Sequence, residues 1–86
     1  MIKHNSYFEG AVQSLGFETD GKKTVGVMVP GTHDFGVASI PETITVITGA
    51  FTAKGVKYVA GQKFSFEPGD KIVFINDVTS AYLCEY

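Results

Sequence analysis

The centre of the chain carries a clear alternation of side-chain types. Ile44 and Val46 fall on one side of the pattern, and Thr45 and Ile47 fall on the other. A period of two in a run rich in β-branched residues predicts a β-strand. Gly49 interrupts this run and an apolar stretch resumes directly after it, so we expect the chain to turn back on itself there in a hairpin.

Runs of the same kind predict strands along most of the remaining chain. A first strand is expected over residues 7–15, with Phe8, Val12 and Leu15 facing the core. Residues 71–75 contain four consecutive apolar positions, which is typical of a strand buried on both faces. The other predicted strands cover residues 24–29, 33–37, 51–53, 56–59, 63–66 and 81–86.

No stretch shows a sustained helical period with capping residues. About eight or nine short strands, with turn signals every 8 to 12 residues or so, indicate a closed or sandwiched antiparallel β-structure. We therefore expect one all-β domain over residues 1–86, of the jelly-roll barrel kind. A chain of this size buries only about 60% of its unfolded surface. Together with a charged fraction of 19%, this predicts a homodimer.

Charge and cysteine content restrict the binding partners and the cellular location that we expect. The net charge is −2, and all seven positive residues are lysines. Nucleic-acid binders favour arginine and a basic stripe, so nucleic acid is not expected as a partner. The single cysteine excludes an internal disulfide. No apolar run is long enough for a signal peptide or a membrane span, so we expect a soluble cytoplasmic protein without a membrane partner.

The spacing of several residues is similar to the two motifs of the cupins, which are jelly-roll barrels that hold a ligand inside. Glu42 and Gly49 fit the end of the first motif. The positions of its two histidine ligands fall on Phe35 and Val37, and the last histidine of the second motif falls on Ile72. Apolar side chains cannot coordinate a transition metal, so no metal site is expected. The second-motif residues that fit are Gly61, Gly69 and Asn76, with Glu67 in place of a proline.

A closer resemblance covers nearly the whole chain. Five blocks occur in the same order as in the small cupin-type pyrimidine/purine nucleoside phosphorylases. They are Tyr7-Phe8-x-Gly10-x-Val12-x-Ser14-x-Gly16-Phe17, Val25-Gly26-Val27-Met28-Val29-x-Gly31, Glu42-x-x-Thr45-Val46-Ile47-x-Gly49, Ala60-Gly61-x-x-Phe64 and Tyr82-Leu83-Cys84-x-Tyr86.

This resemblance implies phosphorolysis of nucleosides to free base and ribose 1-phosphate. Inorganic phosphate would be the co-substrate, and no metal or organic cofactor would be needed. The segment between Phe51 and Tyr58 is shorter than in the family, and the loop at residues 66–70 differs from the family pattern. These departures keep a second hypothesis open, namely a non-catalytic, metal-free cupin that binds a small metabolite or serves as a dimeric interaction module.

The resemblance also suggests which residues form the site. Glu42, at the start of the central strand, is the expected ribose partner or electrostatic stabiliser, with a solvated carboxylate as the alternative. Tyr82 is expected to stack on the base or donate its hydroxyl, or else to pack in the core. Thr45 and Ser80 are candidate phosphate donors, and His33 is a further substrate-binding candidate, with an exposed histidine at a strand end as its alternative. Lys57, Lys63 and Lys71 are possible phosphate partners, and Cys84 is expected to pack in the core without acting as a nucleophile.

Overall fold

The computed structural model describes residues 1–86 as ten β-strands without a helix. No helix that could cross a membrane is present. The strands are β1 (Lys3–Tyr7), β2 (Val12–Glu18), β3 (Lys22–Met28), β4 (Gly31–Val37), β5 (Glu42–Thr48), β6 (Ala50–Ala53), β7 (Val56–Val59), β8 (Lys63–Phe66), β9 (Lys71–Asn76) and β10 (Ser80–Glu85).

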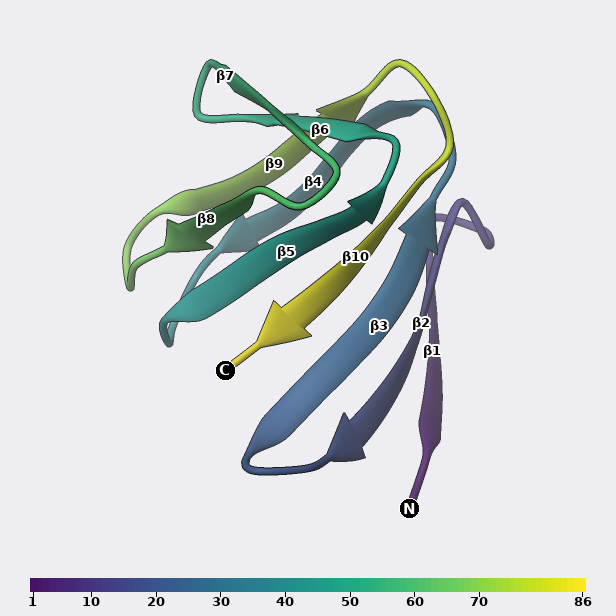
Figure 1. Cartoon of the computed structure of the whole chain (residues 1–86), viewed down its shortest axis with the longest axis vertical. Coiled ribbons are helices and arrows are strands. Elements are labelled where there is room, and N and C mark those ends of the chain that lie inside the picture. The colour runs from purple at the N-terminus through teal and green to yellow at the C-terminus, as the bar shows by residue number, and fades with distance from the viewer.

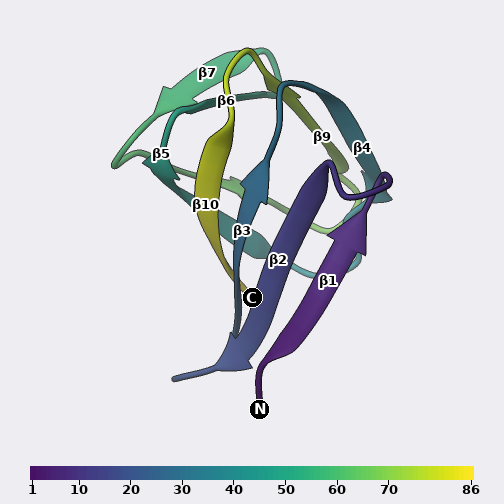
Figure 2. The ribbon, with the colours of Figure 1, turned by 90° about the vertical axis from the view of Figure 1, so that its right-hand side faces the viewer.

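The strands form two antiparallel sheets that face one another. The larger sheet has the order β1-β2-β3-β10-β5-β8, and the smaller one has the order β4-β9-β6-β7. The sheets are not hydrogen-bonded into a closed cylinder, but the all-β jelly-roll prediction is confirmed. At the end of the molecule where the N-terminus lies, β1, β2 and β3 extend beyond the smaller sheet (Figures 1 and 2). The inner face of the larger sheet is therefore only partly covered.

Aromatic side chains fill the space between the two sheets. Phe74 of β9 contacts four other phenylalanine rings edge to face, with centroid distances of 5.6 Å to Phe51, 5.5 Å to Phe66, 6.0 Å to Phe35 and 6.2 Å to Phe64. Edge-to-face pairs are favourable beyond their buried area because the positive ring edge meets a negative ring face. This cluster holds the smaller sheet against the larger one.

The prediction of one strand over residues 7–15 is wrong. Phe8 and Glu9 both have positive φ angles, of 53° and 57°, and they turn the chain between β1 and β2. Residues other than glycine rarely adopt this region, so the turn could not be predicted from these two residue types. Of the three expected core residues only Val12 is buried, while Phe8 and Leu15 are each 47% exposed.

Two further expectations about strands are also wrong. The chain does not form a hairpin at Gly49, because β5 and β6 belong to different sheets and the chain turns a corner between them. Gly49 has a φ of 80°, and a Cβ at this position would overlap the Ser80 side chain. Strand β9 is buried on one face only, since Ile72 and Phe74 point inward while Ile75 is exposed.

Candidate active site

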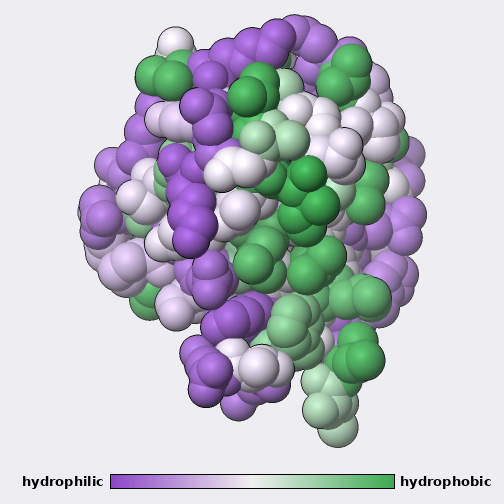
Figure 3. All heavy atoms as spheres, viewed as in Figure 1, coloured by the Kyte–Doolittle hydropathy of each residue, from purple (hydrophilic) through white to green (hydrophobic).

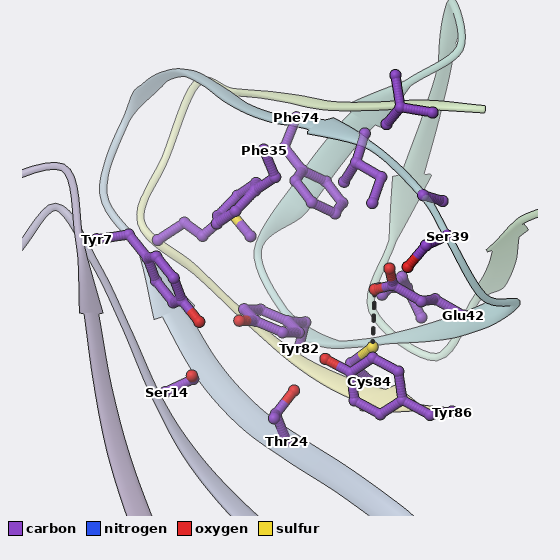
Figure 4. A pocket seen from close by; sticks show the side chains of 15 residues that line it. Tyr7, Ser14, Thr24, Phe35, Ser39, Glu42, Phe74, Tyr82, Cys84 and Tyr86 are labelled. Carbon is purple, nitrogen blue, oxygen red and sulfur yellow. Dashed lines mark hydrogen bonds between the residues drawn. The ribbon is translucent and has the colours of Figure 1, made fainter. Parts of the chain in front are cut away.

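A cavity of about 270 Å³ lies between the two sheets (Figure 4). Its polar wall comes mainly from the larger sheet, and its apolar wall comes mainly from β4 and β9. The polar side chains are Tyr7, Ser14, Thr24, Ser39, Glu42, Tyr82, Cys84 and Tyr86, and the apolar ones include Phe35, Val37, Ile72 and Phe74. A ligand in this cavity would meet aromatic and aliphatic surface on one side and hydrogen-bonding groups on the other, as is usual for small-molecule sites.

Strand register brings the polar wall together. Thr24 of β3 lies directly opposite Cys84 of β10, and Gly26 lies directly opposite Tyr82. Because side chains alternate between the two faces of a strand, these residues all point inward. Gly26 makes room for its neighbour, since a Cβ there would lie only 2.5 Å from the Tyr82 hydroxyl oxygen. The absence of a side chain at Gly26 therefore sets the position of the Tyr82 ring.

Glu42 and Cys84 form the polar centre of the cavity. The thiol donates a hydrogen bond to Glu42 Oε1 at 3.4 Å, and Figure 4 shows both side chains at the end of the cavity near Tyr86. Burial raises the pKa of Glu42, and the thiol bond opposes this shift only in part. Burial and the neighbouring carboxylate raise the pKa of Cys84 to about 12. Cys84 is therefore a protonated donor at neutral pH, and the partly buried Glu42 side chain accepts its hydrogen bond.

Tyr82 is another group of the site whose pKa is strongly raised. Burial raises the pKa of its hydroxyl to about 12, so the group is a neutral donor at neutral pH. Its ring packs edge to face on Phe51 with a centroid distance of 5.9 Å. Figure 4 shows the Tyr82 hydroxyl pointing toward that of Tyr7. The structure thus brings Glu42 and Tyr82 together in one cavity, as the two candidate catalytic residues require.

The other three candidate site residues do not line this cavity. Thr45 lies on the opposite face of β5, between Leu83 of β10 and Lys63 of β8. The Ser80 hydroxyl accepts a hydrogen bond from the Ala50 N–H at 2.9 Å and has carbonyl oxygens nearby for its own proton. It serves the corner between β5 and β6.

His33 also has a structural environment. Its side chain is only 5% exposed, so the expectation of an exposed histidine at a strand end is wrong. Its Nε2 lies 2.8 Å from the Val29 carbonyl oxygen, and the ring of Phe8 stacks over it at 5.8 Å. None of the three lysines suggested as phosphate partners lines the cavity, and Lys71 pairs with Asp34 at 3.5 Å instead.

The positions that carry metal ligands in cupins line this same cavity. Phe35, Val37 and Ile72 present carbon atoms where the motif would place imidazoles. No group of three or more histidine, cysteine or carboxylate side chains is arranged to hold a metal ion. The donor set of this cavity does not fit a transition metal.

The sequence interpretation missed several residues of the cavity. Tyr7, Ser14, Thr24 and Tyr86 were not proposed as site residues, and Cys84 was assigned to the core alone, although it is both buried and part of the cavity wall. The signal was present for two of them. Ser14 and Thr24 occupy inward positions of the alternating pattern in β2 and β3, where an apolar residue is the usual choice.

The fold is that of the cupins. A cupin of the RmlC-like type from Shewanella frigidimarina superimposes with a TM-score of 0.71 at 15% identity, covering 96% of this chain and 80% of that one. A protein of unknown function from Vibrio parahaemolyticus superimposes with a TM-score of 0.90 at 40% identity, covering 100% and 98% of the two chains.

Sequence comparison then defines the family. The family model described as pyrimidine/purine nucleoside phosphorylase matches residues 2–86. A pyrimidine/purine nucleoside phosphorylase from Vibrio cholerae is 44% identical, with 100% of this chain and 97% of the relative covered. Another from Pseudomonas putida is 43% identical, with 100% and 98% covered. The chain belongs to the pyrimidine/purine nucleoside phosphorylase family, as its sequence blocks predicted.

Proposed function

We propose that the protein is a nucleoside phosphorylase that cleaves pyrimidine and purine nucleosides with inorganic phosphate. The products are the free base and ribose 1-phosphate. Family membership over the full chain supports the reaction. The observation that carries the site is a carboxylate and a neutral tyrosine hydroxyl facing one aromatic cavity between the sheets.

The cavity offers the groups that the ribose and the base require in this reaction. A phosphate oxygen forms a bond to the anomeric carbon while the glycosidic C–N bond breaks, and its electron pair leaves with the base, which takes up a proton. Positive charge develops on the ribose in the transition state. The Glu42 carboxylate stabilises that charge and accepts hydrogen bonds from ribose hydroxyls. Tyr82 donates to the substrate, and Phe35 and Phe74 supply apolar surface for the base.

The proposed reaction is a pentosyl transfer that uses phosphate as its only co-substrate. Hydrocarbon side chains at the three cupin ligand positions support the absence of a metal from the mechanism. With one cysteine in 86 residues the chain forms no internal disulfide, whereas small secreted domains are usually rich in them, which supports a reducing compartment such as the cytoplasm. The lack of arginine and the net charge of −2 argue against nucleic acid as a partner.

We also propose that the protein is a homodimer that uses the outer face of the larger sheet. The outward side chains of β3, β10 and β5 are mostly apolar and form a band across the centre of Figure 3. Val27 and Ile47 in this band are 46% and 50% exposed. Thr45 Oγ1 on the same face is shielded from solvent without a hydrogen-bond partner. A second copy would cover this apolar face, because the same patch can pair with itself across a two-fold axis.

One observation favours the alternative of a non-catalytic cupin that binds a small metabolite. The cavity is lined by no lysine, arginine or histidine, so it holds no cation for a phosphate dianion. The same cavity would accept a neutral, partly aromatic ligand. The two hypotheses differ in whether phosphate takes part.

Product analysis separates the two hypotheses. The purified protein is incubated with uridine, adenosine, guanosine or inosine, with and without phosphate, and free base and ribose 1-phosphate are measured. Phosphate-dependent release of both products is expected. No release from any nucleoside, by protein with an intact β-rich circular dichroism spectrum, would contradict the enzyme and leave the binding protein.

A further inference from the structure

A second hollow of about 450 Å³ adjoins the active-site cavity. It lies on the inner face of β1, β2 and β3, where these strands extend beyond the smaller sheet (Figure 2). Tyr7, Thr24 and Tyr86 line both spaces. A ligand in the hollow would therefore be separated from a ligand in the cavity only by side chains that belong to both.

The hollow holds the cations that the cavity lacks. Lys3 of β1 and Lys22 of β3 both line it, together with one carboxylate, that of Glu18. Lys22 Nζ lies 5.2 Å from the centroid of the Tyr86 ring, so its ammonium group is held beside the shared wall. The cavity, in contrast, contains the Glu42 carboxylate and no cation.

Neutral donors complete the hollow. Thr24 supplies a hydroxyl at the shared wall, and Asn5 lies next to it on the inner face of β1. The Asn5 amide donates to the Ser14 hydroxyl at 3.4 Å, which links the donors of the hollow to the polar wall of the cavity. Ammonium, hydroxyl and amide groups are those that bind phosphate oxygens.

Electrostatics favours different places for the two substrates, the nucleoside in the cavity and the phosphate in the hollow. A phosphate dianion placed beside Glu42 without a cation would have two negative charges in apolar surroundings, which is strongly unfavourable. In the hollow, the dianion would meet two ammonium groups and remain partly hydrated.

We propose that the hollow is the phosphate site of the reaction, with Lys22 and Lys3 binding the dianion and Thr24 directing it toward the ribose in the cavity. This inference rests on the proposed phosphorylase function and names the residues that bind its co-substrate. The phosphate oxygen then approaches the anomeric carbon from the side of Thr24 and Tyr86, while the base lies against Phe35 and Phe74.

Substitution of single lysines tests the site. Lys22→Met should raise the KM for phosphate at least tenfold and leave the KM for the nucleoside within twofold, and Lys3→Met should act in the same direction. Lys23→Met is the matched control, because Lys23 is adjacent in the chain but pairs with Glu85 at 3.6 Å and does not line the hollow. It should behave as the unmodified protein.

Direct phosphate binding distinguishes failure of this site from failure of the proposed function. Titration calorimetry with inorganic phosphate alone needs no turnover. Binding that Lys22→Met weakens, in a protein that cleaves no nucleoside, would support the site and contradict the phosphorylase. Phosphorolysis with an unchanged phosphate KM in the Lys3→Met/Lys22→Met double variant would overturn the site and leave the enzyme.

A measurement on the unmodified protein covers the case in which the variants do not fold. Addition of phosphate, at ionic strength matched with chloride, should shift the backbone amide resonances of Lys22, Thr24 and Tyr86 in an ¹H–¹⁵N spectrum. Shifts confined to residues outside the hollow would overturn the proposal.

Discussion

Cys84 donates its thiol to Glu42 Oε1 at 3.4 Å, across two neighbouring strands of the larger sheet. Cys84 pairs with Ile44, and Glu42 lies two positions before Ile44 on the same inward face of β5. This bond holds the Glu42 side chain at the cavity wall, and it gives the buried cysteine a place in the cavity as a hydrogen-bond donor. Its raised pKa keeps the proton that the bond requires.

The first prediction concerns the charge of Glu42. Glu42→Gln keeps the shape of the side chain and its acceptor oxygen but removes the charge that stabilises the ribose cation. We expect kcat/KM for uridine phosphorolysis to fall about 100-fold or more. Glu67→Gln is the control, because Glu67 is exposed and lies outside both spaces. Equal rates for the two variants would remove Glu42 from the mechanism.

The second prediction concerns pH. Because the pKa of Glu42 is raised above its ordinary value of 4.5, the rate should fall on acidification with a midpoint above that value. The folded protein holds this proton more tightly than the unfolded chain. Ionisation of Glu42 therefore lowers the free energy of unfolding at pH values above the folded-state pKa. Glu42→Gln should therefore be more stable to urea than the unmodified protein at pH 7. That advantage should disappear as the pH falls through 4.5; an advantage independent of pH would contradict the assignment.

The third prediction tests the fit between Gly26 and Tyr82. Gly26→Ala places a methyl group 2.5 Å from the Tyr82 hydroxyl oxygen and 2.6 Å from Cζ. The ring must move, so we expect a loss of about 1 to 3 kcal/mol in the free energy of unfolding, measured in urea. Gly16→Ala is the matched control, since its nearest atoms lie 3.7 Å away in ordinary contact. If both variants lost the same free energy of unfolding, the missing side chain at Gly26 would not be what makes room for the Tyr82 ring.

The fourth prediction tests the dimer face. Val27→Glu places a charge in the apolar band on the outer face of β3, and we expect the dimer dissociation constant to rise at least 100-fold in sedimentation velocity experiments. Val59→Glu on β7 is the control, because Val59 is exposed to a similar degree, 48% against 46%, but belongs to the other sheet. An unmodified protein that is monomeric at micromolar concentration would exclude the dimer.

The sequence was sufficient for much of the fold, and two of the residues that it suggested for the site, Glu42 and Tyr82, line one cavity. Alternation correctly placed most of the strands and put Tyr82 and Cys84 on one face of β10, because burial of one sheet face imposes a period of two. The alternation did not predict the turn between β1 and β2, because Phe8 and Glu9 adopt positive φ angles that are rare for these residue types. The cupin spacing and the family blocks suggested Glu42 as a site residue and drew attention to the three apolar ligand positions, and all four side chains line the cavity.

Only the tertiary structure decided which strands became neighbours. Pairing of β10 with both β3 and β5 brings Thr24, Cys84 and Glu42 to one wall, although they are far apart in the chain. Sequence spacing carries no record of such pairing, because a strand has the same alternation whichever partner it meets. For the same reason the alternation could not show that Ser80 belongs to the corner at Ala50, or that Lys22 lies beside the ring of Tyr86 while its neighbour Lys23 pairs with Glu85.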